Sequence, residues 1–286
     1  MNHAYGIKSC IDLYHDLYEN KKSASSSSTL LCVGTTPISH VNHPFVPFSI
    51  YLDINDVESP PDWNVIQYES LQKLLYFQLG IHQNSSVVVY STSPMIACRV
   101  IWALCMANIT SVFLLDGGIF QWIKLNLPTT TTPKPPHLSN EPFLSYEPRL
   151  TFLTTSKEIL DCLADCNTII ADVRTLSEHN GETSGYDYIA EKGKIPGSLW
   201  ALAGLGTHDV VDFIDEEGMV RPLEEIGKRW TELGIKQGKK LVFYCGTGWR
   251  ASVAWFIALN LECFDNVSLY DGGWLDFVSK YQDLID

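Results

Sequence analysis

The stretch LVFYCGTGWRASVAWFIAL, residues 241–259, begins with a short apolar run, passes through a glycine-rich loop and continues as a helical pattern. The apolar run covers Leu241–Tyr244, the loop starts at Cys245, and the helical pattern extends from about Ser252 to Leu261. A short, continuous apolar run beside turn residues is typical of a parallel strand that is buried on both faces. The stretch therefore predicts a strand, a loop and a helix, the basic unit of an α/β fold.

The same order of elements occurs earlier in the chain. Val87–Tyr90 is apolar, a loop starts at Ser91, and a helical pattern covers about Ala97 to Ala107. Each half then has a second apolar run and an Asp-Gly-Gly sequence, namely Val112–Leu115 with Asp116-Gly117-Gly118 and Val267–Tyr270 with Asp271-Gly272-Gly273. This repeat places Ser91 opposite Cys245. It predicts two tandem α/β domains, each with three layers, in which helices cover both faces of a mainly parallel central sheet.

A proline-rich segment lies between the two halves. The sequence PTTTTPKPP, residues 128–136, is polar and has no hydrophobic period, which is typical of an extended connection. We expect a first domain over residues 1–130, a linker over residues 131–149 and a second domain over residues 150–286. A chain of 286 residues is long enough for two domains of ordinary size.

Composition and charge exclude several classes of function. The formal net charge is −13, which repels phosphate backbones and argues against a nucleic-acid partner. No stretch is long and apolar enough to span a bilayer, and the N-terminus does not resemble a secretory signal, so we expect a cytoplasmic protein without a membrane partner. The eight cysteines include no CxxC pair, so we expect neither a disulfide scaffold nor a structural metal site.

Cys245 lies where a nucleophile is expected in such a fold, at the carboxyl end of a strand and just before a helix. Backbone amides at a helix N-terminus favour negative charge, and Gly246 and Gly248 let the loop curl around the sulfur. Arg250 adds a positive charge nearby. Each feature favours the thiolate, which is the nucleophilic form of cysteine. The alternative is a buried cysteine in a tight turn; the loop composition favours the reactive thiol.

The loop resembles the active-site loop of rhodanese-type sulfurtransferases. It consists of Cys245, Gly246, Thr247, Gly248, Trp249 and Arg250, followed by Ala251-Ser252. Further matches to this family are Tyr51-Leu52-Asp53, Asp172-Val173-Arg174, Gly193-Lys194-Ile195-Pro196-Gly197 and Asp271-Gly272-Gly273-Trp274. The tandem arrangement is similar to thiosulfate and 3-mercaptopyruvate sulfurtransferases, whose C-terminal domain is catalytic. The stretch GETSGY, residues 181–186, is most similar to multidomain bacterial members.

The resemblance implies a reaction in two steps that needs no metal or organic cofactor. Cys245 takes a sulfur atom from a small donor as a persulfide and passes it to a thiol, cyanide or a protein acceptor. Ser91 stands where the first domain would need its own cysteine, so we expect that domain to be catalytically silent. The substrate-binding arginine of the classical two-domain enzymes has no match within Ser177–Asn180, and no basic residue lies between Cys245 and Arg250. We therefore expect 3-mercaptopyruvate to be favoured over the dianion thiosulfate.

Other residues have a functional and a structural interpretation. Asp172 is expected to support the loop, and Arg174 either faces the anionic site or forms an internal ion pair. His208 either donates to a substrate carboxylate or is a solvent-facing loop residue. The resemblance suggests that the pocket is also lined by Thr183, Ser184 and Trp200.

Two other functions are compatible with parts of this pattern. Cysteine-dependent phosphatases also combine a cysteine, a loop and an arginine, but their C-x5-R loops are one residue longer, whereas Arg250 is the fifth residue after Cys245. A non-enzymatic interaction module is the second alternative. Cys245 and the loop glycines argue against it for the second domain but not for the first.

Overall fold

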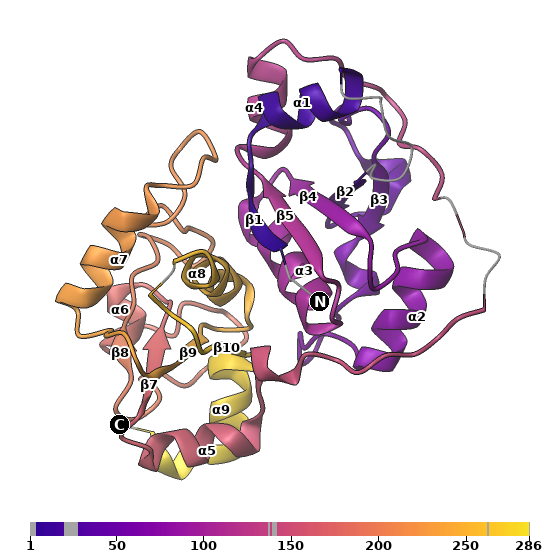
Figure 1. Cartoon of the computed structure of the whole chain (residues 1–286). Helices are drawn as coiled ribbons and strands as arrows, with labels where there is room; N and C mark the ends of the chain where they lie inside the picture. Colours follow the sequence, from indigo (N-terminus) through magenta and orange to yellow (C-terminus); the bar gives the residue numbers. More distant parts are fainter. Residues whose placement is uncertain (1–3, 20–27, 137, 139–141, 262, 286) are drawn as a thin grey trace. The chain divides into compact units, whose positions relative to one another are not determined.

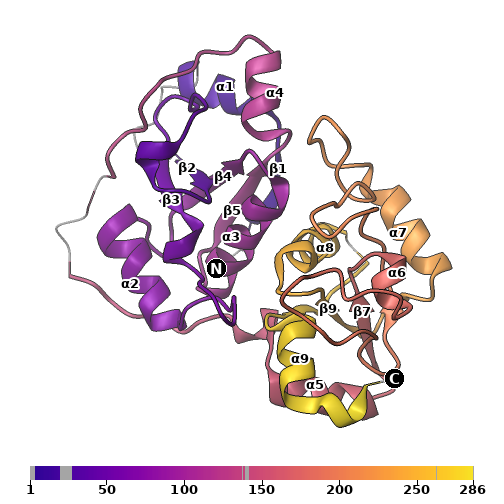
Figure 2. The same cartoon turned by 180° about the vertical axis from the view of Figure 1, so that it is seen from behind.

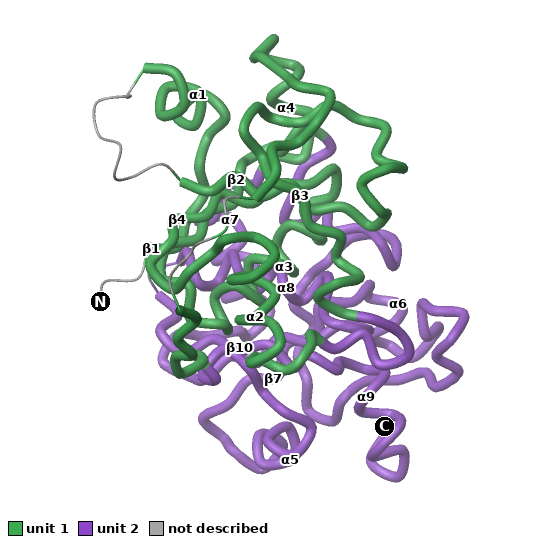
Figure 3. Tube along the Cα trace, turned by 90° about the vertical axis from the view of Figure 1, so that its right-hand side faces the viewer, with its two compact units in different colours: residues 1–58, 65–149, 217–219 green, residues 59–64, 150–216, 220–286 purple. Residues whose placement is uncertain are grey.

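The computed structural model describes residues 4–19, 28–136, 138, 142–261 and 263–285. These residues form two compact units (Figure 3). The first unit comprises the residues up to 58, residues 65–149 and residues 217–219; the second comprises residues 59–64, 150–216 and those from 220 onward.

The first unit is built on a five-stranded parallel sheet. Its strands are β1 (Ala4–Lys8), β2 (Thr29–Gly34), β3 (Ile50–Asp53), β4 (Ser86–Ser91) and β5 (Ser111–Leu115). They are ordered β1-β5-β4-β2-β3, and every neighbouring pair is parallel. The register pairs Cys32 with Tyr90 and Val33 with Ser91, so β2 lies directly beside the strand that ends at Ser91.

Helices cover both faces of this sheet (Figures 1 and 2). They are α1 (Cys10–Tyr18), α2 (Tyr68–Leu79), α3 (Pro94–Met106) and α4 (Gly118–Lys124), with short 3-10 turns η1 (Ile38–His40) and η2 (Ile54–Asp56). Leu13 of α1 and Trp122 of α4 pack in one cluster with Val88 and Tyr90 of β4. Because successive strand residues point to opposite faces, Val87 and Val89 face the other layer, where α3 packs on β2, β4 and β5.

The second unit repeats this architecture. Its strands are β6 (Leu153–Thr154), β7 (Thr168–Asp172), β8 (Leu199–Trp200), β9 (Lys240–Tyr244) and β10 (Val267–Tyr270). Their order, β6-β10-β9-β7-β8, matches that of the first sheet strand for strand, and all pairs are parallel. The register pairs Asp172 with Tyr244, the counterparts of Cys32 and Tyr90.

The second sheet also lies between two helical layers. The helices are α5 (Ser156–Ala164), α6 (Leu176–His179), α7 (Leu223–Glu232), α8 (Trp249–Leu259) and α9 (Gly273–Tyr281), with 3-10 turns η3 (Leu150–Phe152) and η4 (Gln282–Leu284). On one face, Ile159 of α5 and Trp274 of α9 pack with Tyr244. On the other, Trp230 of α7 lies 5.3 Å from the ring of Phe243, and α8 packs on β9 and β10. The predicted tandem three-layer α/β fold is confirmed.

The two halves share a detail that the repeat predicts only in outline. In each unit the tyrosine just before Ser91 or Cys245, namely Tyr90 or Tyr244, hydrogen-bonds a backbone amide and the serine of a Pro-x-Ser sequence. The partners are Val46 N at 3.0 Å and Ser49 Oγ at 2.7 Å in the first unit, and Ile195 N at 3.2 Å and Ser198 Oγ at 3.1 Å in the second. This shared anchor fixes the end of the strand from which each loop starts.

Both helices that follow these loops begin three residues earlier than their apolar pattern indicates. α3 starts at Pro94, whose fixed φ suits the first helical position. α8 starts at Trp249, because Gly248 adopts a left-handed conformation with a φ of 94° and acts as the N-cap. The loop at Cys245 is therefore very short, and the helix N-terminus lies directly beside it.

The proline-rich segment runs along the first unit. Lys134 N–H donates to Ser49 O at 2.6 Å, and Arg149 N–H donates to Met106 O at 2.7 Å. Backbone hydrogen bonds thus hold both ends of this extended segment, where the structure describes it, against the domain that precedes it.

Candidate active site

Cys245 directly follows β9 and is buried, with 1% of its surface exposed. Its Sγ accepts the backbone N–H of Gly248 at 3.2 Å. That amide belongs to the N-cap of α8, an 11-residue helix, so the sulfur lies at the positive end of a helix dipole. The arrangement stabilises negative charge on the sulfur without a side-chain cation.

The loop also depends on glycine at its second position. A Cβ atom on Gly246 would lie 2.2 Å from the ring of Tyr186, so the aromatic ring packs directly on the loop backbone. The Tyr186 hydroxyl in turn accepts a hydrogen bond from Arg250 Nη2 at 2.8 Å. Tyr186 thus covers the loop and is linked to the last residue of the loop.

Arg250 is buried in an ion pair with Glu178. Its Nη1 and Nη2 donate to the two carboxylate oxygens of Glu178 at 2.7 and 2.8 Å. Glu178 also accepts from the backbone N–H and the hydroxyl of Thr175, which form a capping box at the start of α6. The positive charge that the sequence places beside Cys245 is therefore neutralised by a carboxylate that also lies in the site.

The charges of this pair are stable at neutral pH. Burial acts to raise the pKa of Glu178, but hydrogen bonds from Arg250 and Thr175 outweigh it and hold the pKa below its usual range. Burial likewise opposes ionisation of Arg250, yet Tyr186 and Glu178 hold the pKa of its guanidinium above the ordinary value. We infer that Arg250 serves mainly to fix the loop.

Asp172 is the centre of a second buried network, directly behind Cys245. Arg174 Nε and Nη2 donate to its two oxygens at 2.9 and 2.7 Å, and the Tyr244 hydroxyl donates at 2.8 Å. His179 Nδ1 lies 3.0 Å from the same carboxylate. Burial opposes the ionisation of Asp172, but the Arg174 charge and these hydrogen bonds hold the pKa of its carboxyl well below the usual range. The network ties the end of β7 to the residue before Cys245.

The geometry of Arg174 favours its internal role. The side chain is 0% exposed, and its guanidinium is used by Asp172 and by the carbonyl of Gly193 at 2.8 Å. It also stacks on Trp274, 4.9 Å from the ring centre. The structure thus contains the internal ion pair that is one of the two interpretations of Arg174.

Of the other predicted pocket residues, Trp200 ends β8 and the rest lie on loops of the second unit. Thr183 and His208 are exposed, Ser184 and Trp200 are half-buried, and Thr247 is buried. Thr183 Oγ1 accepts the N–H of Gly185, Ser184 Oγ donates to Tyr186 O, and Trp200 Nε1 donates to Arg174 O. Trp249 is half-exposed at the start of α8. Thr183 and Ser184 thus order the loop that carries Tyr186.

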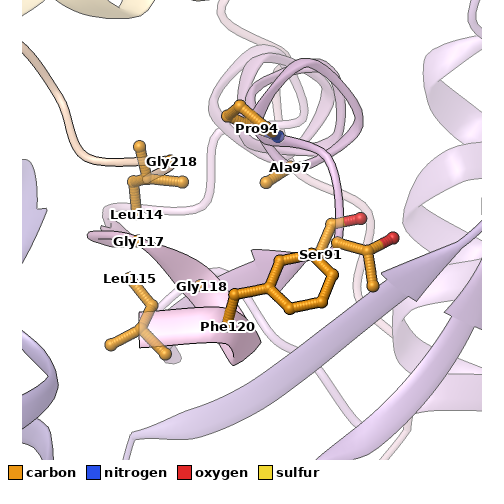
Figure 4. Close-up of a pocket in the computed structure, with 10 residues that line it drawn as sticks. Ser91, Pro94, Ala97, Leu114, Leu115, Gly117, Gly118, Phe120 and Gly218 are labelled. Carbon is orange, nitrogen blue, oxygen red and sulfur yellow. The ribbon is translucent and has the colours of Figure 1, made fainter. Parts of the chain in front are cut away.

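The counterpart of this site in the first unit lacks the parts that hold a thiolate. Ser91 is followed three positions later by Pro94, which has no N–H to donate, whereas the equivalent Gly248 contacts Cys245 Sγ. The pocket beside Ser91, drawn in Figure 4, has a volume of about 30 Å³ and is lined by Pro94, Ala97 and Phe120 among others. That volume holds only a few water molecules.

Two further features are absent from the described residues. Those residues contain no group of three or more histidine, cysteine or acidic side chains arranged to hold a metal ion. Nor do they include a helix with the length and apolar character needed to cross a bilayer.

Comparison with known families decides how this site is to be interpreted. Residues 155–280 match the model of the rhodanese-like domain. The second unit contains a rhodanese-like domain. The match spans the second unit from the start of α5 to the end of α9 and includes Cys245 and its loop.

The chain is similar to several proteins over most of its length. It is 33% identical over 277 residues to the thiosulfate sulfurtransferase YnjE of Escherichia coli K12. This alignment covers 93% of the present chain and 61% of YnjE. It is 28% identical over 233 residues to the sulfur carrier protein TtuD of Thermus thermophilus, or 78% of each chain. The chain thus spans about three fifths of the length of YnjE.

Solved structures give the same result. The crystal structure of YnjE matches with a TM-score of 0.84 and 31% identity, covering 93% of this chain and 64% of YnjE. A structure of EanB in which ergothioneine is covalently linked with a cysteine persulfide matches with a TM-score of 0.86 and 26% identity, covering 96% of this chain and 67% of EanB.

Two residues of this rhodanese site were not singled out from the sequence. Glu178 lies 72 residues before Arg250, and nothing in the local pattern pairs them. The sequence Thr175-Leu176-Ser177-Glu178 does carry a capping-box signal, which places the carboxylate at a helix start. Tyr186 ends the GETSGY stretch, but its contact with Gly246 depends on tertiary structure.

Proposed function

We propose that this protein is a sulfurtransferase in which Cys245 carries the transferred sulfur as a persulfide. The observation that supports this most strongly is the contact between Cys245 Sγ and the Gly248 amide at the start of α8. A thiolate and a persulfide anion are both stabilised by such a donor. The relatives named thiosulfate sulfurtransferase and sulfur carrier protein support the same class of reaction.

The chemistry proceeds in two displacements. The Cys245 thiolate attacks the outer sulfur of the donor and forms a sulfur–sulfur bond. The bond between that sulfur and the rest of the donor breaks, and its electron pair leaves on sulfite from thiosulfate or on the enolate of pyruvate from 3-mercaptopyruvate. An acceptor thiolate, cyanide or a protein cysteine then attacks the outer sulfur, and Cys245 leaves as the thiolate.

We further propose that only the second half is catalytic. In this proposal residues 1–130 form a silent domain, residues 131–149 form the linker and residues 150–286 form the catalytic domain. Ser91 in place of cysteine and Pro94 in place of the donating amide support it.

Replacing Ser91 with alanine is expected to leave sulfur transfer nearly unchanged. Ser91 Oγ accepts the N–H of Ser93 at 3.2 Å, a local turn contact that does not activate a nucleophile. The measurement is the steady-state rate of transfer to cyanide, with a thermal melt to verify folding. A loss of about 100-fold, equivalent to about 2.7 kcal/mol of barrier, in a folded variant would assign catalysis to the first domain.

We propose that 3-mercaptopyruvate is the preferred donor. Thiosulfate is a compact dianion that is best held by free positive charge beside the thiol. Arg250 and Arg174 are both paired with carboxylates, and the two non-glycine residues between Cys245 and Arg250, Thr247 and Trp249, carry no charge. The net charge of −13 also disfavours a dianion. A monoanion with a ketone can be held by backbone amides and hydroxyls.

The expected result is a higher kcat/KM for 3-mercaptopyruvate than for thiosulfate. Both donors are compared with one acceptor at fixed ionic strength, because the rate with the dianion depends more strongly on salt. A kcat/KM about tenfold higher for thiosulfate, equivalent to about 1.4 kcal/mol of transition-state binding, would contradict the proposal. It would require a free cation beside Cys245.

The geometry argues against phosphatase activity. In a cysteine-dependent phosphatase the loop arginine must face the bound phosphate, whereas two nitrogens of Arg250 are committed to Glu178 and the Tyr186 hydroxyl. A carboxylate this close to the site also repels a phosphate dianion. Absence of p-nitrophenyl phosphate hydrolysis is expected; turnover that is lost in Cys245→Ser would overturn this conclusion.

One observation favours a second type of acceptor. EanB has been solved with hercynine and with ergothioneine, which carries on its imidazole ring a sulfur that hercynine lacks. A tyrosine and a threonine were substituted in those structures. Their sequence distances from the persulfide cysteine equal those of Tyr186 and Thr247 from Cys245. Burial raises the pKa of Tyr186, so its phenol stays protonated and able to donate.

This second candidate function is sulfur transfer to the imidazole ring of a histidine betaine. The experiment incubates persulfide-loaded protein with hercynine and looks for ergothioneine by mass spectrometry. Product that forms with the unsubstituted protein and decreases in Tyr186→Phe would support it. If no ergothioneine forms while the same preparation still transfers sulfur to cyanide, this second function is wrong. The acceptor is then a thiol, cyanide or a protein.

A further inference from the structure

The first turn of α9 binds the backbone of the Cys245 loop directly. Trp274 N–H donates to Cys245 O at 2.7 Å, and Leu275 N–H donates to Gly246 O at 3.1 Å. This close approach requires glycine at the start of α9. Gly273 has a φ of 56°, and a Cβ atom there would lie 2.5 Å from Cys245 O. The first turn of α9 thus holds two successive loop carbonyls.

These two contacts set the direction of the loop amides. In a planar trans peptide the C=O and the following N–H point in opposite directions. Because the carbonyls of Cys245 and Gly246 point toward α9, the N–H groups of Gly246 and Thr247 point away from it. The first turn of α9 therefore fixes the peptides on either side of Gly246, and with them the loop that leads to Gly248, whose N–H contacts Cys245 Sγ.

Asp276 holds that first turn in place. Its carboxylate accepts the hydroxyl of Tyr270, the last residue of β10, at 2.5 Å, and also the hydroxyl of Ser156 at the start of α5. Lys280 Nζ lies 2.6 Å from the other oxygen. Figures 1 and 2 show α5 beside α9. Asp276 therefore joins the strand before the turn, the helix after it and a neighbouring helix.

The equivalent position in the first unit lacks this anchor. The Asp-Gly-Gly repeat aligns Asp276 with Gln121, whose Oε1 is buried without a hydrogen-bond partner among the described residues. The turn itself is nevertheless retained, since Gly118 has a φ of 53° and a Cβ there would lie 2.6 Å from Ser91 O. The carboxylate anchor thus accompanies the cysteine, whereas the turn alone is common to both halves.

We propose that Asp276 is a positioning residue that aligns the amides around Cys245 through the first turn of α9. It touches neither the sulfur nor a substrate; it acts by fixing the N–H groups that hold the carbonyls of Cys245 and Gly246. The expected effect of Asp276 on sulfur transfer rests on the proposed function. The expected effect of Asp276 on the reactivity of the Cys245 thiol does not.

The test measures alkylation of Cys245 by iodoacetamide in Asp276→Asn as a function of pH, with the modified peptide identified by mass spectrometry. Asparagine keeps the size of the side chain but loses its charge and one acceptor. The alkylation rate at neutral pH is expected to fall about tenfold, and the pH midpoint of the rate to rise by about one unit, because fewer amides stabilise the thiolate. Alkylation needs no sulfur donor, so this result is independent of the proposed reaction.

Gln121→Ala is the matched control at the equivalent position of the first unit, and it is expected to leave both the midpoint and the rate unchanged. A folded Asp276→Asn with an unchanged pH profile would overturn the proposal. If that variant does not fold, Tyr270→Phe decides the question, because it removes a single hydroxyl from Asp276. The pH midpoint should then rise by a smaller amount, and an unchanged midpoint in folded Tyr270→Phe would equally refute the role of Asp276.

Discussion

Cys245→Ser is expected to abolish sulfur transfer and to leave the fold intact. Serine is close to cysteine in size and can still accept the Gly248 N–H, so the loop keeps its contacts. Its hydroxyl ionises far less readily than a thiol in the same position and forms no persulfide. The measurement is the transfer rate with 3-mercaptopyruvate and with thiosulfate, together with a thermal melt.

Cys166→Ser provides the control for this experiment, since Cys166 is an exposed cysteine of the same unit. Its activity should equal that of the unsubstituted protein. If Cys245→Ser retained most of the transfer activity, another cysteine would have to be the sulfur carrier, and the assignment of the site would be wrong.

Asp172→Asn is expected to cause a large loss of stability. It leaves Arg174 as a fully buried cation without its carboxylate, a situation that costs about 3–5 kcal/mol. The Tyr244 hydroxyl and His179 would also face an amide instead of a charge, which weakens the hold on the residue before Cys245. The loss is measured by denaturant unfolding, with a probe that reports on the second unit.

The same substitution should change the pH dependence of stability. The pKa of Asp172 is lower in the folded state than in the unfolded chain. Its ionised form therefore contributes its full stability at a pH above the pKa of an ordinary aspartate, about 3.9. That contribution disappears as the pH falls further, and the Asn variant should lack this part of the acid sensitivity. Asp16→Asn, which removes a partly exposed pair with Lys8, should cost at most about 1 kcal/mol. An equal loss in both variants would contradict the role of the buried network.

Much of the fold follows from the sequence because its signals are local and occur twice. Apolar runs such as Val87–Tyr90 and Leu241–Tyr244 correspond to β4 and β9, and the Asp-Gly-Gly sequences mark the starts of α4 and α9. Strands β6 and β8 have only two residues each and carry no periodicity, so they could not be predicted. Both lie at the edges of the sheet, where pairing with one neighbour is enough.

The site could be predicted only as far as the loop itself. Cys245 and its glycines are contiguous, and their position after a strand is visible in the sequence. The electrostatics depend on partners distant in sequence, because Glu178 neutralises Arg250 across 72 residues and the ring of Tyr186 covers Gly246. Arg174 and Asp172 are two residues apart, but their burial, which decides between a substrate ligand and an internal ion pair, is a property of the whole domain.

The central claim is that Cys245 carries sulfur as a persulfide. The most direct measurement is mass spectrometry of the intact protein and its peptides after incubation with 3-mercaptopyruvate or thiosulfate and removal of the excess donor. The account predicts an added mass of one sulfur atom on the peptide that contains Cys245, lost again on addition of cyanide. Unmodified Cys245, or a cyanide-sensitive sulfur on another cysteine, would contradict it.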